Sequence, residues 1–234
     1  MSLINEFETS GNWLFKYRSY LPIIIFPLLF YSLITPLSSS TINILLIIGL
    51  SISYIGESIR IYTIAFVSSG TSGRNTNEQI ASSLNKKGIY SIVRHPLYLG
   101  NFFIFLGPFI YTGNIFSITI FILMFCIYYE RIMFAEEAFL YKKFGSEFIE
   151  WSSKTPPFIP NITLYSGNKS NYKIKKIILQ EYPGICGIIA IFTTIIALRN
   201  YYYKLNPILS DYWQILFLIN VIIFISIRTF KKIN

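Results

Sequence analysis

The chain has 234 residues, of which 53% are hydrophobic and only 13% are charged. Soluble domains carry about 25% charged residues, so this composition excludes an ordinary soluble protein and indicates residence in a lipid bilayer. The net charge of +9 does not indicate a nucleic-acid partner, because the basic residues alternate with apolar runs instead of forming one patch. Cys126 and Cys186 lie singly inside apolar runs, so we expect neither a disulfide nor a metal site.

Apolar runs long enough to cross a bilayer, roughly 20 residues each, recur along the whole chain. In chain order they are 20–35, 42–67, 97–129, 184–198 and 212–227. Turn-forming residues at 112–114 interrupt the third run just after Pro108, which we expect to disturb the helix. We therefore predict an all-α, polytopic transmembrane helical bundle of about six spans. Because the first arm of this hairpin is short, five crossings with a re-entrant arm are the alternative.

Lysine and arginine are concentrated on alternate connections between the runs, a pattern typical of cytoplasmic loops. The connections around 36–41 and 112–114 carry no charge, whereas those at 68–96 and 130–183 are strongly basic. Both termini and the basic loops are therefore predicted to be cytoplasmic. The start of the chain is polar and acidic, so no cleavable signal peptide is expected. The many Ile, Asn and Lys residues favour a bacterial origin, and hence the inner (cytoplasmic) membrane.

Two polar segments flank the predicted hairpin, and the first is residues 68–100. It contains the only histidine of the chain, His95. Pro96 disfavours a helical conformation at His95, which places that residue at the mouth of the hairpin. Tyr90 and Tyr98 provide rings with a polar tip, which suits the enclosure of a nucleoside. Such residues also occur at membrane boundaries, so this second reading stays open.

The second polar segment, residues 128–160, begins as a predicted helix that Gly145 ends. Glu130 and Glu137 share one face of this helix. Glu130 and Arg131 lie at the end of an apolar run, where ionisable groups tend to mark functional sites unless they have reached the headgroup layer.

The second apolar run contains Glu57 and Arg60, three residues apart. On a helix these side chains can pair with each other. The alternative is that Arg60 reaches the polar site from within the membrane.

Two stretches in these segments together resemble a known family. GIYSIVRHPLYLG at 88–100 and EEAFLYKKFG at 136–145 resemble the GxYxxxRHPxYxG and EExxLxxxFG signatures of the isoprenylcysteine carboxyl methyltransferase-like family, which includes phospholipid methyltransferases. Their order and their separation by one apolar hairpin match as well. The resemblance covers residues 54–160. It implies a helical membrane protein whose cofactor, S-adenosylmethionine, lies in a cytoplasmic pocket between the two motifs, while the acceptor enters from the membrane.

Positions that match the family motifs imply the residues of this pocket. The implied cofactor-binding residues are Asn75, Ser82, Ser83, Leu84, Asn85, Tyr90, His95, Pro96, Leu97, Tyr98 and Glu136. Gly100 is added to them because a glycine permits close backbone approach. The candidate catalytic residues are Arg94, Arg131 and Glu137, and the candidate substrate-binding residues are Arg60, Arg74 and Glu130.

One departure from the family pattern concerns the acceptor. Relatives place an arginine four residues before the first glutamate, and Ile132 occupies that position here. Arg131 is one residue earlier, a shift that rotates its side chain by about 100° on a helix. Arg131 therefore cannot be assumed to take the same role, and the other arginines are alternatives.

The resemblance implies a membrane-embedded methyltransferase for a lipid or lipidated acceptor. A lipid phosphate, a headgroup amine and a prenylcysteine carboxylate are all compatible, with a membrane lipid favoured. An ionised oxygen needs no base, because orientation alone can lower the barrier by ~7–11 kcal/mol. An amine acceptor would need a base to remove its proton, and His95 and Glu137 are the candidates.

One rival function is another kind of enzyme, and a second comes from a different class. Membrane reductases of the sterol or enone type use NADPH and share a related helical core. A transporter or a scaffold is the non-enzymatic alternative, although the chain shows no internal repeat and its polar clusters lie on one predicted side.

The chain divides into four predicted regions. Residues 1–40 form an N-terminal region with the first span, and residues 41–160 form the methyltransferase-like core. Residues 161–182 form a basic interfacial segment in which lysines alternate with apolar residues. Residues 183–234 add two further spans.

Overall fold

The computed structural model describes residues 2–67, 79–167 and 174–233. Regular structure in these ranges is helical, apart from one isolated antiparallel bridge between Gly88 and Ser166. The predicted all-α class is therefore confirmed. The helices are α1 (Leu3–Tyr17), α2 (Leu21–Ser32), α3 (Ser39–Phe66), α4 (Pro96–Thr112), α5 (Ile115–Phe144), α6 (Ser146–Ser152), α7 (Ile174–Tyr202) and α8 (Asp211–Ile233), with 3-10 turns at Arg18–Tyr20, Ile89–Ser91 and Ile162–Leu164.

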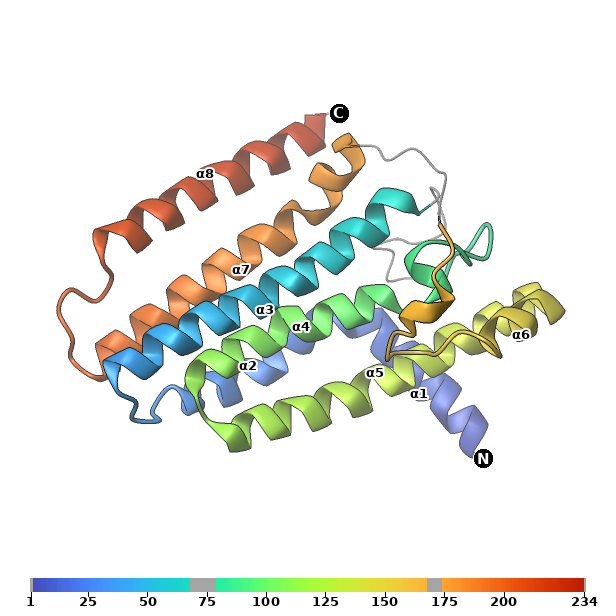
Figure 1. Cartoon of the computed structure of the whole chain (residues 1–234), viewed down its shortest axis with the longest axis horizontal. Helices are drawn as coiled ribbons and strands as arrows, with labels where there is room; N and C mark the ends of the chain where they lie inside the picture. Colours follow the sequence, from blue (N-terminus) through green and yellow to red (C-terminus); the bar gives the residue numbers. More distant parts are fainter. Residues whose placement is uncertain (1, 68–78, 168–173, 234) are drawn as a thin grey trace.

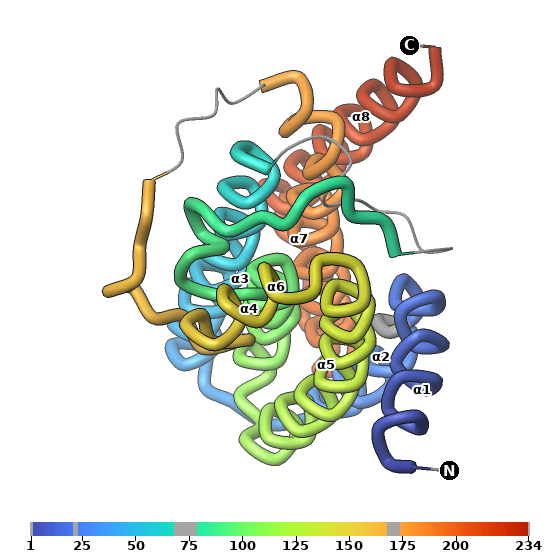
Figure 2. The backbone as a smooth tube through the Cα atoms, turned by 90° about the vertical axis from the view of Figure 1, so that its right-hand side faces the viewer, coloured from blue at the N-terminus to red at the C-terminus, as the bar shows by residue number. Residues whose placement is uncertain are grey.

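The long helices run roughly side by side in one bundle. Figure 1 shows α7, α3, α4 and α5 in that order, with α8 outside α7. Figure 2 views the bundle from one end, with α1 at one side, where it packs against α5. The connections between α2 and α3, between α4 and α5 and between α7 and α8 lie at one end of the bundle (Figure 1). Helices α1 and α6 and the stretches at 79–95 and 153–167 gather at the other end.

Four helices in the described ranges are long and apolar enough to cross a membrane, namely α3, α5, α7 and α8. The apolar helices α2 and α4 are shorter, with 12 and 17 residues. At ~1.5 Å per residue they measure ~18 Å and ~26 Å, less than the ~30 Å of a bilayer core. The six expected spans are thus all helical, but in the described ranges only four have the length of a full span.

The turn between α4 and α5 lies where the sequence predicted it. Gly113 adopts a left-handed conformation with φ 68°, which a residue without a side chain adopts readily. The side chain of Asn114 then caps α5 by accepting a hydrogen bond from the backbone N of Ser117 at 3.0 Å. The expectation that Pro108 disturbs the helix is wrong, because α4 continues through it to Thr112.

Helices α3 and α4 pack through small residues. A Cβ atom on Gly56 would lie 2.5 Å from the carbonyl oxygen of Gly100, and one on Gly49 would lie 2.6 Å from that of Gly107. Ser53 lies in the same seam and donates to the carbonyl oxygen of Ile104 at 3.0 Å. Such seams let membrane helices approach closely. They fix α4, and with it the start of the polar segment, against α3.

Arg199 of α7 is buried at the end of the bundle where α4 connects to α5. Its Nη2 donates to the carbonyl oxygen of Thr35 at 2.6 Å, and its Nη1 donates to that of Tyr111 at 3.4 Å. These bonds satisfy carbonyl groups at the ends of α2 and α4. Arg199 therefore ties three helices together at this end.

The basic interfacial segment predicted at 161–182 is only partly visible. Residues 168–173 lie outside the described ranges, and residues 174–182 are the first turns of α7. That helix continues through Pro183 to Tyr202 without a break. The predicted boundary at 182/183 therefore falls inside one helix.

Helix α1 was not predicted from the polar sequence before the first run. It packs against α5, where Phe7 meets Phe134 edge to face at 5.6 Å. Gly11 of α1 lies so close to the Arg131 carbonyl oxygen that a Cβ atom would clash there. The N-terminal residues therefore form a wall of the polar end of the bundle.

Candidate functional site

A cavity of about 830 Å³ opens at the polar end of the bundle and continues between its helices. This volume lies in the upper part of the range for small-molecule sites, ~300–1,000 Å³. The predicted site residues on its wall are Arg60, Ser83, Leu84, Asn85, Tyr90, Arg94, His95, Pro96, Leu97, Tyr98 and Glu136. The two polar segments thus meet around one cavity.

His95 lies at the mouth of this cavity in a non-helical conformation directly before α4, as expected from Pro96. Its Nε2 lies 2.8 Å from Oε1 of Glu137, and its Nδ1 lies 3.4 Å from Oε2 of Glu136. Both ring nitrogens face carboxylates, so both need a proton, and the imidazolium form satisfies them. Burial opposes this charge, but the hydrogen bonds to Glu136 and Glu137 outweigh it and raise the pKa of His95 above its ordinary value.

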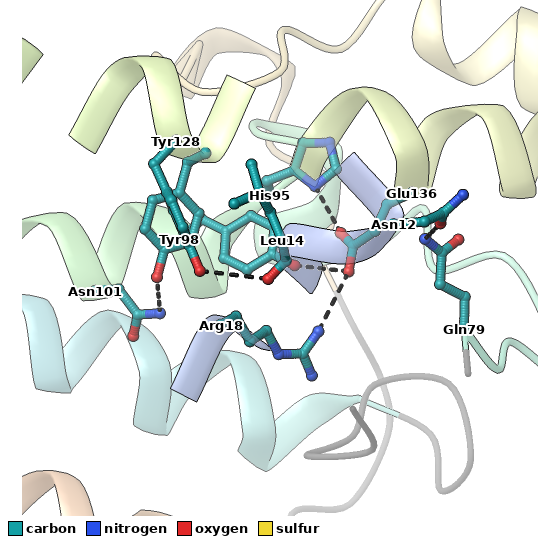
Figure 3. A network of polar contacts seen from close by, with 10 residues as sticks. Asn12, Leu14, Arg18, Gln79, His95, Tyr98, Asn101, Tyr128 and Glu136 are labelled. Atoms are coloured by element: carbon teal, nitrogen blue, oxygen red, sulfur yellow. Dashed lines mark hydrogen bonds and ion pairs between the residues drawn. The ribbon is translucent and has the colours of Figure 1, made fainter. Parts of the chain in front are cut away.

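Glu136 joins three elements of the site. It accepts a hydrogen bond from the Tyr98 hydroxyl at 2.7 Å, and Nη1 of Arg18 lies 3.9 Å from the same oxygen. Figure 3 shows His95, Tyr98 and Arg18 arranged around this carboxylate. The chain segments that supply these side chains are far apart in the sequence, and Glu136 is the point at which α5 meets α4 and the end of α1.

The backbone around His95 is held by the stretch after α6. Arg94 N donates to the carbonyl oxygen of Pro156 at 2.9 Å, and His95 N donates to that of Pro157 at 3.2 Å. The indole of Trp151 donates to the Tyr90 carbonyl oxygen at 3.0 Å. The proline-rich stretch therefore fixes the first motif beside the second.

Below the polar mouth the cavity becomes apolar. Its wall there is formed by α2, α4 and α7, through Ile25, Phe26, Leu29, Phe105, Phe109, Ile188 and Ile191. We call this part the apolar lobe. It is suited to a hydrocarbon chain, since an apolar group gains free energy when it leaves water for such a wall.

Arg60 stands on the cavity wall with its guanidinium engaged by neighbours. Its Nε and Nη2 donate to the two oxygens of Glu181 on α7 at 2.9 and 3.0 Å, and its Nη1 donates to Asn101 at 2.8 Å. Glu57, the partner considered from the sequence, directs its carboxylate toward Gly184 of α7. Arg60 therefore reaches the cavity, and its ion pair holds α7 against α3.

Arg94 and Glu137 form a pair at the edge of the cavity. Nη1 of Arg94 lies 3.0 Å from Oε2 of Glu137. Glu137 does not itself line the cavity, and it contacts the site through His95.

Arg131, a candidate catalytic residue, faces away from the cavity. Its guanidinium lies over the Phe7 ring at 3.7 Å and donates to the Ser10 hydroxyl of α1 at 3.2 Å. Ile132, at the position where relatives carry arginine, is fully buried in the bundle. The rotation expected from the one-residue shift thus directs Arg131 to α1.

Five other predicted site residues either do not line the cavity or lie outside the described ranges. Ser82 and Glu130 are exposed, and Gly100 lies in the α3–α4 seam, where it contacts Arg60 and Gly56. Arg74 and Asn75 lie outside the described residues.

Sequence reasoning missed Arg18, which lines the cavity directly after α1. A signal was present, because Phe7, Gly11, Leu14 and Phe15 have the spacing of one helix face and would have predicted α1. It also missed the contribution of α2 and α7, since their apolar residues look like ordinary spans.

Residues 41–147 match the family model described as phospholipid methyltransferase. The cobalt-zinc-cadmium resistance protein CzcN of Cupriavidus metallidurans is 31% identical over 123 residues, which cover 53% of this chain and 51% of that protein. No solved structure matches the chain significantly.

Two yeast proteins, each named protein-S-isoprenylcysteine O-methyltransferase, are also similar. The one from Schizosaccharomyces pombe is 34% identical over 38% of this chain and 41% of its own length, and the one from Saccharomyces cerevisiae is 32% identical over 56% and 53%. The chain thus spans about half the length of the curated relatives it matches. The match at 41–147 contains both motifs and the hairpin between them, so the core of this chain is similar to the phospholipid methyltransferase family.

Proposed function

We propose that this protein is an integral membrane methyltransferase that uses S-adenosylmethionine to methylate a lipidic acceptor at the cytoplasmic face of a bacterial inner membrane. The observation that carries the proposal is the shape of the cavity. Its mouth is lined by the motif residues His95, Tyr98 and Glu136, and it continues into the apolar lobe. The family of the core and the names of the yeast relatives support methyl transfer.

The residues at the mouth suit this cofactor. The Glu136 carboxylate borders the cavity with a side chain that is 26% exposed, so it can accept hydrogen bonds from a hydroxyl or an amino group. Tyr90 contributes an aromatic ring to the cavity wall, and Ser83 and Asn85 contribute further polar groups. The Tyr98 ring packs against His95 and Tyr129. When bound, the cofactor would supply a sulfonium methyl group, which a nucleophile can attack at carbon while the sulfur leaves as a neutral thioether.

The protein's own residues act by position and charge. Glu136 and Glu137 hold the imidazolium of His95, so His95 donates hydrogen bonds and does not accept a proton from the acceptor. The cavity walls align the two reactants, and the apolar lobe keeps water from the acceptor chain. Alignment of this kind can lower a barrier by ~7–11 kcal/mol, which suffices for an acceptor oxygen that is already ionised.

A binding experiment tests this function against the reductase alternative. Purified protein in detergent would be titrated with S-adenosylhomocysteine and, separately, with NADPH. We expect binding of the first only, and loss of binding in His95→Ala and in Glu136→Ala. Glu150→Ala is the control, because Glu150 is exposed on α6.

Thermal unfolding of each variant would show whether it is folded. Binding of NADPH alone would contradict the proposed function. Binding by either site variant at the affinity of the unaltered protein would remove that residue from the site.

A further inference from the structure

Arg18 places a guanidinium at the junction of the polar mouth and the apolar lobe. Helix α1 ends at Tyr17, and the 3-10 turn Arg18–Tyr20 leads into α2. The turn directs Arg18 toward Glu136, with Nη1 3.9 Å from its Oε1 (Figure 3). The guanidinium packs over the Phe15 ring at 3.9 Å, and its side chain is 17% exposed. Arg18 is thus both held in place and in contact with the cavity.

Each of the three arginines on the cavity wall in the described part of the chain contacts a carboxylate. Arg60 forms a bidentate pair with Glu181 at 2.9 and 3.0 Å, and Arg94 lies 3.0 Å from Glu137. Nη1 of Arg18 lies 3.9 Å from Oε1 of Glu136. A guanidinium carries five N–H donors, so it can bind a further anion beside an existing contact. Its planar shape matches carboxylate and phosphate groups.

Among the side chains that line the cavity in the described part of the chain, cationic groups outnumber carboxylates. Arg18, Arg60, Arg94 and His95 line it with Glu136 and Glu181, while Glu137 lies behind His95 and Glu57 lies beside Gly184. The sulfonium of the cofactor would add positive charge. An anionic acceptor lowers the electrostatic energy of such a site, whereas a protonated amine raises it.

The chain that follows Arg18 leads directly to the apolar lobe. Helix α2 follows within three residues and contributes Ile25, Phe26 and Leu29 to the lobe wall. A molecule with its chain in the lobe would present its headgroup to Arg18. The N-terminal region outside the family-matched residues 41–147 therefore supplies both a cation and part of the chain-binding surface.

We propose that Arg18 binds the headgroup anion of the acceptor, and that the acceptor is an amphiphile with an ionised phosphate or carboxylate oxygen. This inference rests on the proposed function. In the reaction, the acceptor oxygen forms a bond to the methyl carbon while the carbon–sulfur bond breaks and its electron pair stays on sulfur. An ionised oxygen releases no proton, so the step needs neither a base nor a further reactant. Arg18 holds the oxygen in place.

Binding of defined amphiphiles tests the role of Arg18. Protein in dodecyl maltoside would be titrated with dodecyl phosphate, with N-acetyl-S-farnesylcysteine and with dodecylamine, each with and without S-adenosylhomocysteine. We expect at least one anionic probe to bind and dodecylamine not to bind. Arg18→Ala should weaken binding of the anionic probe by roughly 10- to 100-fold, the range for hydrogen bonds to charged groups. The two anionic arms distinguish a phosphate from a carboxylate acceptor.

Matched variants separate this role from a structural one. Arg18→Lys keeps the charge but loses the planar fork, so the affinity for the anionic probe should be intermediate. Lys16→Ala removes an exposed cation two residues away and should change nothing. All three variants should still bind S-adenosylhomocysteine, which also shows that they are folded.

Three results would overturn the inference. The first is that the unaltered protein binds neither anionic probe. The second is that Arg18→Ala binds the probe with unchanged affinity. The third is that Arg18→Ala loses binding of S-adenosylhomocysteine, which would place Arg18 at the cofactor. Failure of the unaltered protein to bind S-adenosylhomocysteine would instead contradict the proposed function, and the probe titrations without it would still report on Arg18.

Discussion

Nε2 of His95 lies 2.8 Å from Oε1 of Glu137, although 42 positions separate these residues in the sequence. The contact joins the residue before α4 to the part of α5 that extends beyond the hairpin. It closes the hairpin at the polar end, and the Gly113 turn closes it at the other end. The geometry of the site therefore depends on the charge of one imidazole.

The first prediction concerns pH. The carboxylates of Glu136 and Glu137 raise the pKa of His95 in the folded state, whereas in the unfolded chain it should be about 6.5. The charged imidazolium thus stabilises the fold fully below pH ~6.5, and this contribution is lost as the pH rises through the folded-state pKa. We expect the Tm of the unaltered protein to fall between pH 6 and pH 9 more steeply than that of His95→Gln. Parallel Tm curves would contradict the proposed imidazolium.

The second prediction concerns the pair between Arg60 and Glu181. Glu181 is 1% exposed, so removing its partner leaves a buried charge. Arg60→Met should lower the free energy of unfolding by about 3–5 kcal/mol, and the double variant Arg60→Met with Glu181→Leu should recover most of the loss. Reversible unfolding in sodium dodecyl sulfate would measure both. Lys154→Ala, which removes an exposed ion pair with Glu150, should cost less than about 1 kcal/mol.

The third prediction concerns the seam between α3 and α4. A methyl group at Gly56 would meet the backbone oxygen of Gly100, which cannot move without separating the helices. Gly56→Ala should therefore destabilise the fold by about 1–3 kcal/mol. Gly187→Ala is the matched control, because no atom lies within 4 Å of its added Cβ. That change should stabilise α7 by about 0.5–1 kcal/mol, and equal losses in both variants would rule out the seam as the cause.

The fourth prediction concerns Arg199. Its replacement by leucine leaves the carbonyl oxygens of Thr35 and Tyr111 without their donor. We expect a loss of about 1.5–3 kcal/mol in the free energy of unfolding, together with faster proteolysis at the connection between α2 and α3. Arg228→Ala, at an exposed position of α8, should have little effect on either measurement. Unchanged protease sensitivity in Arg199→Leu would contradict a role in tying these helix ends together.

Much of the fold could be predicted because each apolar run carries its own signal. The five runs became α2, α3, the α4–α5 hairpin, α7 and α8, and the turn at Gly113 and Asn114 came from residues that favour turns. The lengths of the helices could not be predicted as well, because hydropathy does not show that α2 has only 12 residues. The similarity to the phospholipid methyltransferase family was also predicted from the sequence, because both motifs lie within the matched residues 41–147.

The candidate site was predicted on its motif side only. Residues close together in a motif, such as His95 and Tyr98, lie on neighbouring turns of the chain, so their spacing in the sequence predicts that they are near each other. Arg18 reaches Glu136 only because α1 packs against α5, a contact between distant segments that no local pattern encodes. The same packing holds Arg131 against α1 and away from the cavity. Pairing partners such as Glu181 for Arg60 depend likewise on the placement of α7.

Of the three helices that form the wall of the apolar lobe, α4 lies within residues 41–147, whereas α2 and α7 lie outside them. If the lobe holds the acceptor chain, part of the surface that contacts this chain is encoded apart from the motif residues at the mouth. Mutations in α2 or α7 can then widen or shorten the lobe without touching His95 or Glu136. Under this arrangement, one transfer chemistry can be redirected among lipids of different tail length by changes in two flanking helices.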